Sequence, residues 1–294
     1  MQMNYEILYK NSLDKEVLFN KRPPFIVTKF EGLSAPQNIL NTETAYGQDG
    51  ANLTGQRYDV RNLTIEGKLV AENSEDRQSL RIQMNNAFSR DLAGTLYYKE
   101  GDKTYSIDVL VEHAPIFIED TQRPYHVSFQ IVLKALNPYW IDESLFDSLI
   151  PLTTTENLFE FPLNITPDFE FATIRSGDII KIMNGGDIRV GAVFHMKFRG
   201  EVTNPRIYNV LTQEYIGFEG TYQPSTEFIF STVYKEKSII KTEDGFKENG
   251  MPYRMEDSSF IMLDIGENYL QVQADEGVNS VIVNVQFRPL VIGI

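Results

Sequence analysis

The chain has 294 residues, enough for two domains of ordinary size, with 42% hydrophobic residues, 12% aromatic residues and a net charge of −14. This composition excludes a disordered chain, and the negative charge, most of which falls after residue 140, argues against a protein that grips nucleic acid. The absence of cysteine excludes disulfides, thiolate metal sites and a cysteine nucleophile.

The N-terminal sequence MQMNYEILYK lacks a basic start followed by a long apolar run, so it predicts no signal peptide. No stretch approaches the ~18 consecutive apolar residues that a membrane-spanning helix needs. We therefore expect a protein that does not insert into a membrane.

Several segments of the first half alternate apolar and polar residues with a period of two, namely Arg61–Leu69, Tyr105–Glu112 and His126–Lys134. Such alternation predicts strands with one face on a core and the other toward water or a partner. The abundance of Phe and Tyr, which suit a pleated surface, favours the same conclusion. The sequence therefore predicts an all-β fold.

One segment breaks this alternation and predicts a helix over Asn73–Asp91. Asn73 or Ser74 can cap its start, and the acidic residues that follow suit the positive end of the helix dipole. An apolar stripe at helical spacing consists of Leu80, Met84, Ala87 and Phe88. This helix is expected either to cover one face of a sheet or to contact another subunit.

A domain boundary is expected after the segment Asn137–Trp140. The segment 141–167 that follows is rich in proline and threonine, which predicts an extended crossing segment. The predicted organisation is an N-terminal β domain at 1–140, a linker at 141–167 and a C-terminal β domain at 168–294.

The second half predicts a series of short strands separated by turn signals, which together are typical of an antiparallel β-sandwich or jelly roll. The candidates are Ile179–Met183, Val190–Arg199, Arg206–Leu211, Glu227–Thr232, Ser259–Leu263, Tyr269–Ala274 and Ser280–Phe287. Gly185 and Gly186 stand between the first two candidates and predict a hairpin turn.

Catalytic and metal-binding motifs are not found in the sequence. None of the three histidines has a second histidine at metal-ligand spacing, and His126 and His195 lie on strand faces opposite the apolar rows. Nucleophile-elbow and phosphate-loop motifs are absent, and no carboxylate pair is marked for glycoside hydrolysis. We therefore expect no enzyme activity, cofactor or metal ion.

Asn204-Pro205-Arg206, followed by Asn209, resembles the sugar-binding N-P-R motif of galectins. Galectins also carry a His two residues before the Asn, where this chain has Val202, and a Trp that stacks on the sugar. Asn204, Arg206 and Asn209 are therefore weak sugar-binding candidates, with Tyr208 or Tyr222 as stacking aromatics. The alternative is that Asn204-Pro205 forms a turn before a strand.

The order of motifs along the chain is more specific than any of them alone. The series runs through Phe25-Ile26-Val27, Tyr46-Gly47-Gln48-Asp49-Gly50, Ile65-Glu66-Gly67, His113-Ala114-Pro115, Asn137-Pro138-Tyr139-Trp140, Ile182-Met183-Asn184-Gly185-Gly186-Asp187, Asn204-Pro205, Asp257-Ser258-Ser259 and Ile265-Gly266-Glu267-Asn268. Over nearly the whole chain this series resembles the distal tail (Dit) family of siphophages.

The resemblance implies a structural protein of the virion tail tip, assembled in the host cytoplasm as a homohexameric ring. An N-terminal β-sandwich with a helix and an extended hairpin would build the ring, and a galectin-like sandwich would form the C-terminal half. The implied partners are the tail tube protein, the tape measure protein, and the tail-associated hub and receptor-binding proteins. DNA would pass through the channel without specific binding.

Ring contacts are expected in the Tyr97–Val111 hairpin and the Ala71–Arg90 helix, with Arg77, Arg81, Tyr97 and Tyr98 as candidate residues. Edge strands need pairing or cover, which a closed ring supplies. The alternative function is a carbohydrate-binding adhesion module that uses the C-terminal sandwich. An enzyme that acts on glycans is a third hypothesis, and it requires two facing carboxylates in a groove.

Overall fold

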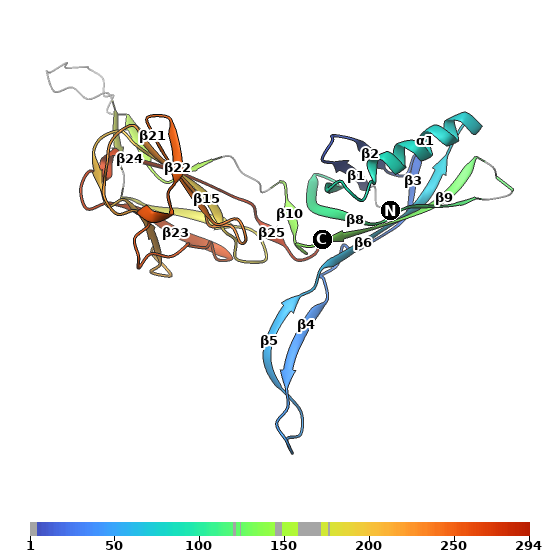
Figure 1. Ribbon diagram of the computed structural model, residues 1–294, viewed down its shortest axis with the longest axis horizontal. Coiled ribbons are helices and arrows are strands. Elements are labelled where there is room, and N and C mark those ends of the chain that lie inside the picture. Colours follow the sequence, from blue (N-terminus) through green and yellow to red (C-terminus); the bar gives the residue numbers. More distant parts are fainter. Residues whose placement is uncertain (1–4, 120–121, 124, 145–148, 158–171, 176) are drawn as a thin grey trace. The chain divides into compact units, whose positions relative to one another are not determined.

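The computed structural model describes residues 5–119, 122–123, 125–144, 149–157, 172–175 and 177–294 (Figure 1). The chain forms two compact units: unit 1 holds residues 1–144 together with 290–294, and unit 2 holds residues 145–289. Strands dominate both units, and the described part contains a single α-helix, so the all-β prediction is confirmed. Within the same residues, no helix is long and apolar enough to cross a membrane.

Unit 1 is built on one antiparallel sheet with the strand order β2-β1-β7-β8-β9-β6-β3, to which β10 and β25 are added beside β8. The strands are β1 (Tyr5–Asn11), β2 (Glu16–Phe19), β3 (Phe25–Glu31), β6 (Arg61–Val70), β7 (Gly94–Glu100), β8 (Lys103–Glu119), β9 (His126–Ala135), β10 (Trp140–Asp142) and β25 (Leu290–Val291). The long strand β8 pairs with β7 through its first half and with β9 through its second half.

The period-two alternation explains which face of this sheet is buried. In β9, Val127, Phe129, Ile131 and Leu133 are buried, while the residues between them are half-buried on the opposite face. β6 pairs with β9 in register from Arg61–Ala135 to Val70–His126, so the apolar residues of both strands lie on the same side.

Helix α1 (Ser74–Ala87) covers the buried face of the sheet, which is one of the two roles expected for the predicted helix. Asn73 caps it by accepting a hydrogen bond from the Asp76 amide at 2.9 Å, and the structure ends the helix at Ala87 rather than Asp91. The ring of Phe88 stacks on Tyr9 of β1, with 4.1 Å between the ring centroids. The Tyr9 ring in turn leaves no room for a Cβ at Gly94, which explains the glycine at the start of β7.

Strands β4 (Asn38–Glu43) and β5 (Asn52–Tyr58) pair only with each other and form a hairpin outside the main sheet of unit 1 (Figure 1). Almost all of its side chains are exposed. Gly47 and Gly50 take positive φ angles of 77° and 83° at the tip, where a left-handed backbone favours glycine.

Unit 2 contains two larger antiparallel sheets, ordered β11-β24-β15-β20-β21-β22 and β14-β23-β17-β18, and two small pairs, β12-β13 and β16-β19. Their strands are β11 (Ile150–Pro151), β12 (Thr154–Asn157), β13 (Ala172–Arg175), β14 (Ile179–Asn184), β15 (Ala192–Phe198), β16 (Val202–Thr203), β17 (Arg206–Asn209), β18 (Tyr215–Gly217), β19 (Thr221–Tyr222), β20 (Thr226–Ser231), β21 (Ser238–Glu243), β22 (Phe246–Asn249), β23 (Gly266–Gln273) and β24 (Val281–Phe287). Short 3-10 turns occupy Met251–Tyr253 and Val278–Ser280.

The two larger sheets of unit 2 pack face to face through aromatic side chains. Phe218, which directly follows β18, stacks on Phe228 of β20 with 4.1 Å between ring centroids. Phe218 also contacts Phe230 of the same strand edge-on, with 5.3 Å between ring centroids. Unit 2 is therefore a β-sandwich, as the spacing of short strands predicts.

The structure corrects two local predictions in unit 2. Gly185 and Gly186 do not form a hairpin turn, because β14 pairs with β23 while β15 pairs with β20 and β24 in the other sheet. Ser259–Leu263 is not a strand, and of these residues only Leu263 forms a bridge, to Val190. In the polar stretch just before it, the Ser258 hydroxyl donates to the Met255 carbonyl at 2.7 Å, a local bond that competes with strand pairing.

The predicted domain boundaries differ from the two units at both ends of the second domain. β11 and β12 lie within the segment 141–167 and β10 extends into it, while residues 145–148 and 158–167 lie outside the described residues. Residues 290–294 belong to unit 1, because β25 pairs with β10.

Candidate interaction surfaces

Among the described residues, no group of three or more His, Asp or Glu side chains is placed to hold a metal ion. His126 and His195 are half-buried on the strand faces opposite the apolar rows, as predicted, and His113 is exposed on β8. The candidate functional features described below are surfaces of the two units.

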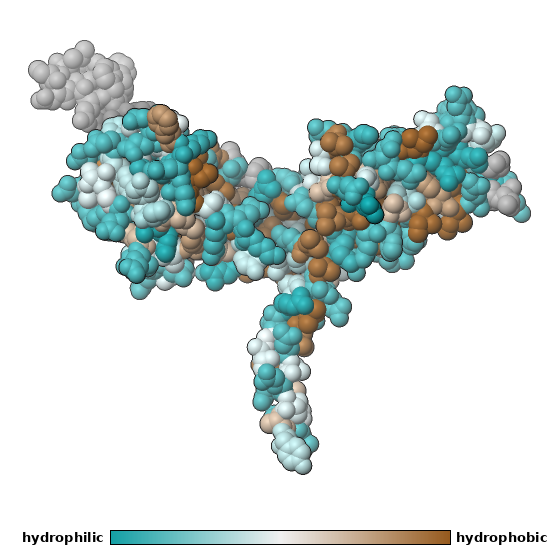
Figure 2. Space-filling model, viewed as in Figure 1, coloured by the Kyte–Doolittle hydropathy of each residue, from teal (hydrophilic) through white to brown (hydrophobic). Residues whose placement is uncertain are grey.

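The β4-β5 hairpin presents an apolar stripe to solvent. Leu40 and Leu53 are 56% and 58% exposed, and the strand register places both on the same face of the ribbon. Hydrophobic atoms along the hairpin are visible in Figure 2. An isolated two-stranded hairpin is marginally stable in water, so this ribbon has the properties of an element that docks on another surface.

The base of the hairpin is held by the buried guanidinium of Arg61. It donates to the backbone carbonyls of Gly32, Ser34, Pro138 (2.7 Å) and Ile292, which come from separate parts of unit 1. Burial lowers the pKa of Arg61 to about 10, which still leaves the guanidinium charged at neutral pH. The side chain therefore fixes the point at which the hairpin leaves the sheet.

A groove of about 540 Å³ runs over the outer face of β1, β7 and β8, the face opposite the helix. Tyr97, Leu110 and Leu136 line it, and Leu110 and Leu136 are exposed. Leu8 lies directly opposite Tyr97 across the β1-β7 pair, and Leu18 lies opposite Leu8 across the β1-β2 pair. Unit 1 therefore has a second apolar surface, which no described element of that unit covers.

The predicted ring-contact residues lie in different environments. Tyr97 lies on the outer face, whereas Tyr98 is buried, stacks on Phe30 and donates to Glu100 Oε2 at 3.0 Å. Adjacent residues of a strand point to opposite faces, so Tyr98 is not available to a partner. Arg81 pairs with Glu119 at 2.9 Å, and Arg77 is half-buried on the same helix.

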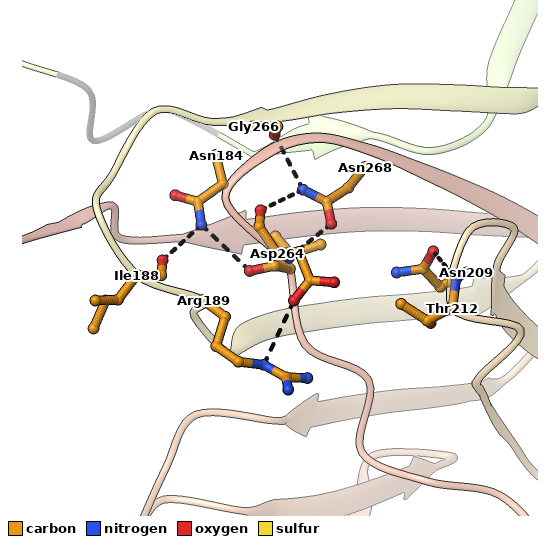
Figure 3. Close-up of polar contacts among 9 residues, drawn as sticks. Asn184, Ile188, Arg189, Asn209, Thr212, Asp264, Gly266 and Asn268 are labelled. Carbon is orange, nitrogen blue, oxygen red and sulfur yellow. Dashed lines mark hydrogen bonds and ion pairs between the residues drawn. The ribbon is translucent and has the colours of Figure 1, made fainter. Parts of the chain in front are cut away.

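Two buried asparagines hold the loop ends of unit 2 (Figure 3). The Asn184 amide donates to the Ile188 and Leu263 carbonyls at 2.9 and 3.3 Å. Asn268 accepts from the Asp264 amide and donates to the Asp264 carbonyl, both at 2.8 Å. Both residues belong to the motifs that carry the family resemblance. Their side chains bind backbone groups of the adjacent loops and so stabilise the fold of unit 2.

The structure brings two of the three sugar-binding candidates together. Asn204 and Arg206 both contact Asp275, at 2.8 and 3.1 Å. Asn209 is buried and accepts hydrogen bonds from the amides of Leu211 and Thr212, so it stabilises a turn (Figure 3). The proposed turn at Asn204 is also present, since this residue has a φ of 53°.

The two candidate stacking aromatics differ in exposure. Tyr222 is buried and donates to the Glu219 carbonyl, so its ring is not available to a ligand. Tyr208 is half-buried on the outward face of its sheet, beside Tyr215 and two glutamines that the sequence reasoning missed. The predicted strand Tyr269–Ala274 contained the signal for this face. Its alternation places Tyr269, Gln271 and Gln273 on the outward side, so these positions carry a phenol and two amides rather than charged groups.

Comparisons with protein families and with solved structures agree, since both find phage tail or baseplate proteins. Residues 13–135 match the phage tail protein RIFT-related domain family. The chain is similar to the Dit protein of SPP1, described as a paradigm of the hub adsorption apparatus in phages that infect Gram-positive bacteria, with 12% identity, a TM-score of 0.66 and coverage of 96% of this chain and 98% of that one. It is also similar to a chain of the phage P2 baseplate in its activated conformation with Ca, with 10% identity, a TM-score of 0.51 and coverage of 97% and 98%. No curated protein sequence matches it.

Proposed function

We propose that this chain, a Dit-like phage tail protein with a RIFT-related domain at residues 13–135, forms a homohexameric ring at the tip of the virion tail. The ring joins the tail tube to the tail-associated hub and receptor-binding proteins, and it is assembled in the host cytoplasm. The tape measure protein and DNA pass through its centre, and the net charge of −14 disfavours retention of the DNA through its phosphates. The protein acts through geometry and contacts, without an enzymatic step.

The observation that carries this proposal is the exposed apolar hairpin of unit 1. Leu40 and Leu53 leave 56% and 58% of their surface exposed in their own chain, and burial of that remainder would contribute roughly 1–1.5 kcal/mol for each. The outer groove lined by Tyr97, Leu110 and Leu136 is an apolar surface of matching character on the same unit. We propose that the hairpin of one copy packs into the groove of the next.

This contact joins two different surfaces of the same chain. Such a heterologous contact closes into a ring when the rotation between neighbouring copies divides a full turn evenly, and otherwise it gives an open filament. A ring also covers the edge strands β2 and β3, whose backbone groups beyond the bridge between Asn20 and Ile26 otherwise remain available for non-specific strand pairing.

The test is the native mass of the purified full-length chain, measured by light scattering coupled to size exclusion, followed by negative-stain images of the main peak. A mass six times that of the chain and a six-fold ring with an open centre are expected. A chain that stays monomeric over a wide concentration range, and also in the presence of the tail tube protein, would contradict the proposal. A closed ring with a different number of copies would correct the stoichiometry alone.

A further inference from the structure

The outward face of the β14-β23-β17-β18 sheet carries a row of side chains that crosses all four strands. The register places Tyr215 opposite Tyr208, Tyr208 opposite Gln271, and Gln271 opposite Ile179. Adjacent strands lie ~4.8 Å apart, so the row extends over about 14 Å. The neighbours of these residues along each strand point inward and are buried, among them Ile207, Ile216, Leu270 and Val272. The row is therefore a continuous platform on the surface of the sandwich.

Beside this row, the polar side chains of the same face form a chain of hydrogen bonds that fixes their orientation. Arg206 Nε donates to Gln273 Oε1 at 3.3 Å, and Gln273 Nε2 donates to Gln271 Oε1 at 2.8 Å. Gln271 Nε2 donates to the Gly177 carbonyl at 2.7 Å. A side-chain amide has two N–H donors, so each glutamine keeps one donor beyond these bonds. The two amide planes are fixed and still able to bind a ligand.

The charges on this face are paired, while one end of it is acidic. Arg206 pairs with Asp275 at 3.1 Å, and Lys181 pairs with Glu267. At the Tyr215 end lies a hollow of about 570 Å³ lined by Asn204, Tyr215, Glu219, Met255, Glu256 and Asp257. These carboxylates repel an anionic ligand, and the paired charges of Arg206 and Lys181 offer it little compensating attraction. The tyrosine rings and amide donors of the face are matched to an uncharged, hydroxyl-rich molecule.

We propose that this face of unit 2 binds a neutral oligosaccharide. One side of a sugar ring presents C–H groups that pack on the rings of Tyr208 and Tyr215, and the hydroxyls at its edge accept from or donate to Gln271, Gln273 and Arg206. Asn204, at the rim of the hollow, reaches the same ligand beyond Tyr215. Every residue involved belongs to one copy of the chain, so the inference does not depend on ring formation.

The experiment applies the full-length protein to an array of immobilised neutral and anionic oligosaccharides. The neutral oligosaccharide with the strongest signal is then titrated by calorimetry. Tyr208→Ala is expected to weaken its binding about tenfold or more, because the loss of a stacking ring removes both buried area and favourable ring contacts. Gln271→Ala and Ile179→Glu are expected to weaken it as well. Ile179 is exposed, so its substitution tests the face without disturbing the core.

The matched control is Tyr234→Ala, which removes a 75% exposed tyrosine from unit 2 outside this sheet and should leave the affinity unchanged. Absence of binding to every neutral oligosaccharide, binding to anionic ones alone, or equal losses in Tyr208→Ala and Tyr234→Ala would each overturn the inference. Native mass is measured on the same samples. A monomer that binds the oligosaccharide supports this inference and contradicts the ring. If no oligosaccharide binds and a substitution on this face lowers the oligomer mass, the face is a protein contact and the inference is overturned.

Discussion

The guanidinium of Arg61 donates a hydrogen bond to the backbone carbonyl of Ile292, a residue 231 positions later in the chain. The same guanidinium binds carbonyls at the hairpin base and at Pro138, and it lies 5.8 Å from the ring centroid of Trp140. The Ile294 amide adds a bond to the Leu33 carbonyl at 3.0 Å. One buried cation therefore joins the hairpin base, the end of β9 and the segment 290–294 within unit 1.

Replacement of Arg61 by Ala is expected to lower the free energy of unfolding of unit 1 by about 3–5 kcal/mol, because several buried carbonyls lose their donor at once. Trp140 is the only tryptophan and is fully buried beside Arg61, so its fluorescence during urea unfolding reports on this unit. Arg57→Ala, which removes an exposed member of a surface ion pair, should change the same quantity by less than about 0.5 kcal/mol. Equal effects of the two substitutions would show that Arg61 is not a structural anchor.

The hydroxyl of Tyr9 is buried without a hydrogen-bond partner among the described residues, and burial raises the pKa of this phenol to about 12. Its ionisation is therefore easier in the unfolded chain, where the pKa is about 10. Between pH 10 and 12 the unfolded state binds fewer protons, so stability that is complete below pH 10 falls by up to about 1.4 kcal/mol per pH unit.

Tyr9→Phe should keep or increase the stability of unit 1 at pH 7, since it removes an unsatisfied buried hydroxyl. Above pH 10 the variant should lose stability less steeply than the wild type. The measurement is the urea midpoint followed by Trp140 fluorescence at several pH values from 7 to 12. A loss of several kcal/mol at pH 7 would show that the hydroxyl has a partner in solution, for example a bound water.

Arg81 tests whether helix α1 contributes to the ring. Its guanidinium pairs with Glu119 and lies 4.8 Å from the ring centroid of Phe117, so a charge reversal affects contacts within the chain as well as contacts between copies. Arg81→Glu is expected to shift the native mass toward the monomer. The double variant Arg81→Glu with Glu119→Arg restores the pair within the chain. If oligomer mass returns with it, the helix acts only within its own unit, and if the mass stays low, Arg81 contacts a neighbouring copy.

The sequence predicted the fold where one physical signal dominates. Alternation identified β6 and β9 because each has one buried face, and the cap at Asn73 identified the start of α1. The sequence did not identify β23 as the partner of β14. The turn residues after a strand do not determine whether the following strand pairs with it or joins the other sheet. The strands β16, β18 and β19 were also missed, since segments of two or three residues carry no measurable period.

The candidate surfaces were predictable only in part. Asn204 and Arg206 were identified from a motif, but their shared partner Asp275 comes from a turn far along the chain. Tyr97 and Tyr98 are adjacent in sequence, and only the strand register decides that Tyr97 faces outward while Tyr98 is buried. The row from Tyr215 to Ile179 requires the order of four strands, which no local pattern contains.

The hairpin stripe gives the most direct test of assembly. Leu40→Asp and Leu53→Asp each place a charge on an exposed surface of the monomer, so the thermal midpoint of the isolated chain should change little. At a contact between copies the same charge is buried without a partner, which costs several kcal/mol per contact and should convert the oligomer to monomer. Leu211→Asp is the matched control, since Leu211 of unit 2 is 62% exposed and lies outside both apolar surfaces of unit 1.

Native mass at equal concentration decides between the outcomes for these variants. Monomers from Leu40→Asp and Leu53→Asp, together with an intact oligomer from Leu211→Asp, would locate the subunit contact on the hairpin. If Leu110→Asp in the groove has the same effect, mixing it with Leu40→Asp provides a further step. Each of these variants retains one of the two complementary surfaces, so a mixture can form one intact contact and should give a heterodimer. A closed ring would not form, because the next contact in the chain joins two altered surfaces. A mixture that stays monomeric would show that the hairpin and the groove do not bind each other.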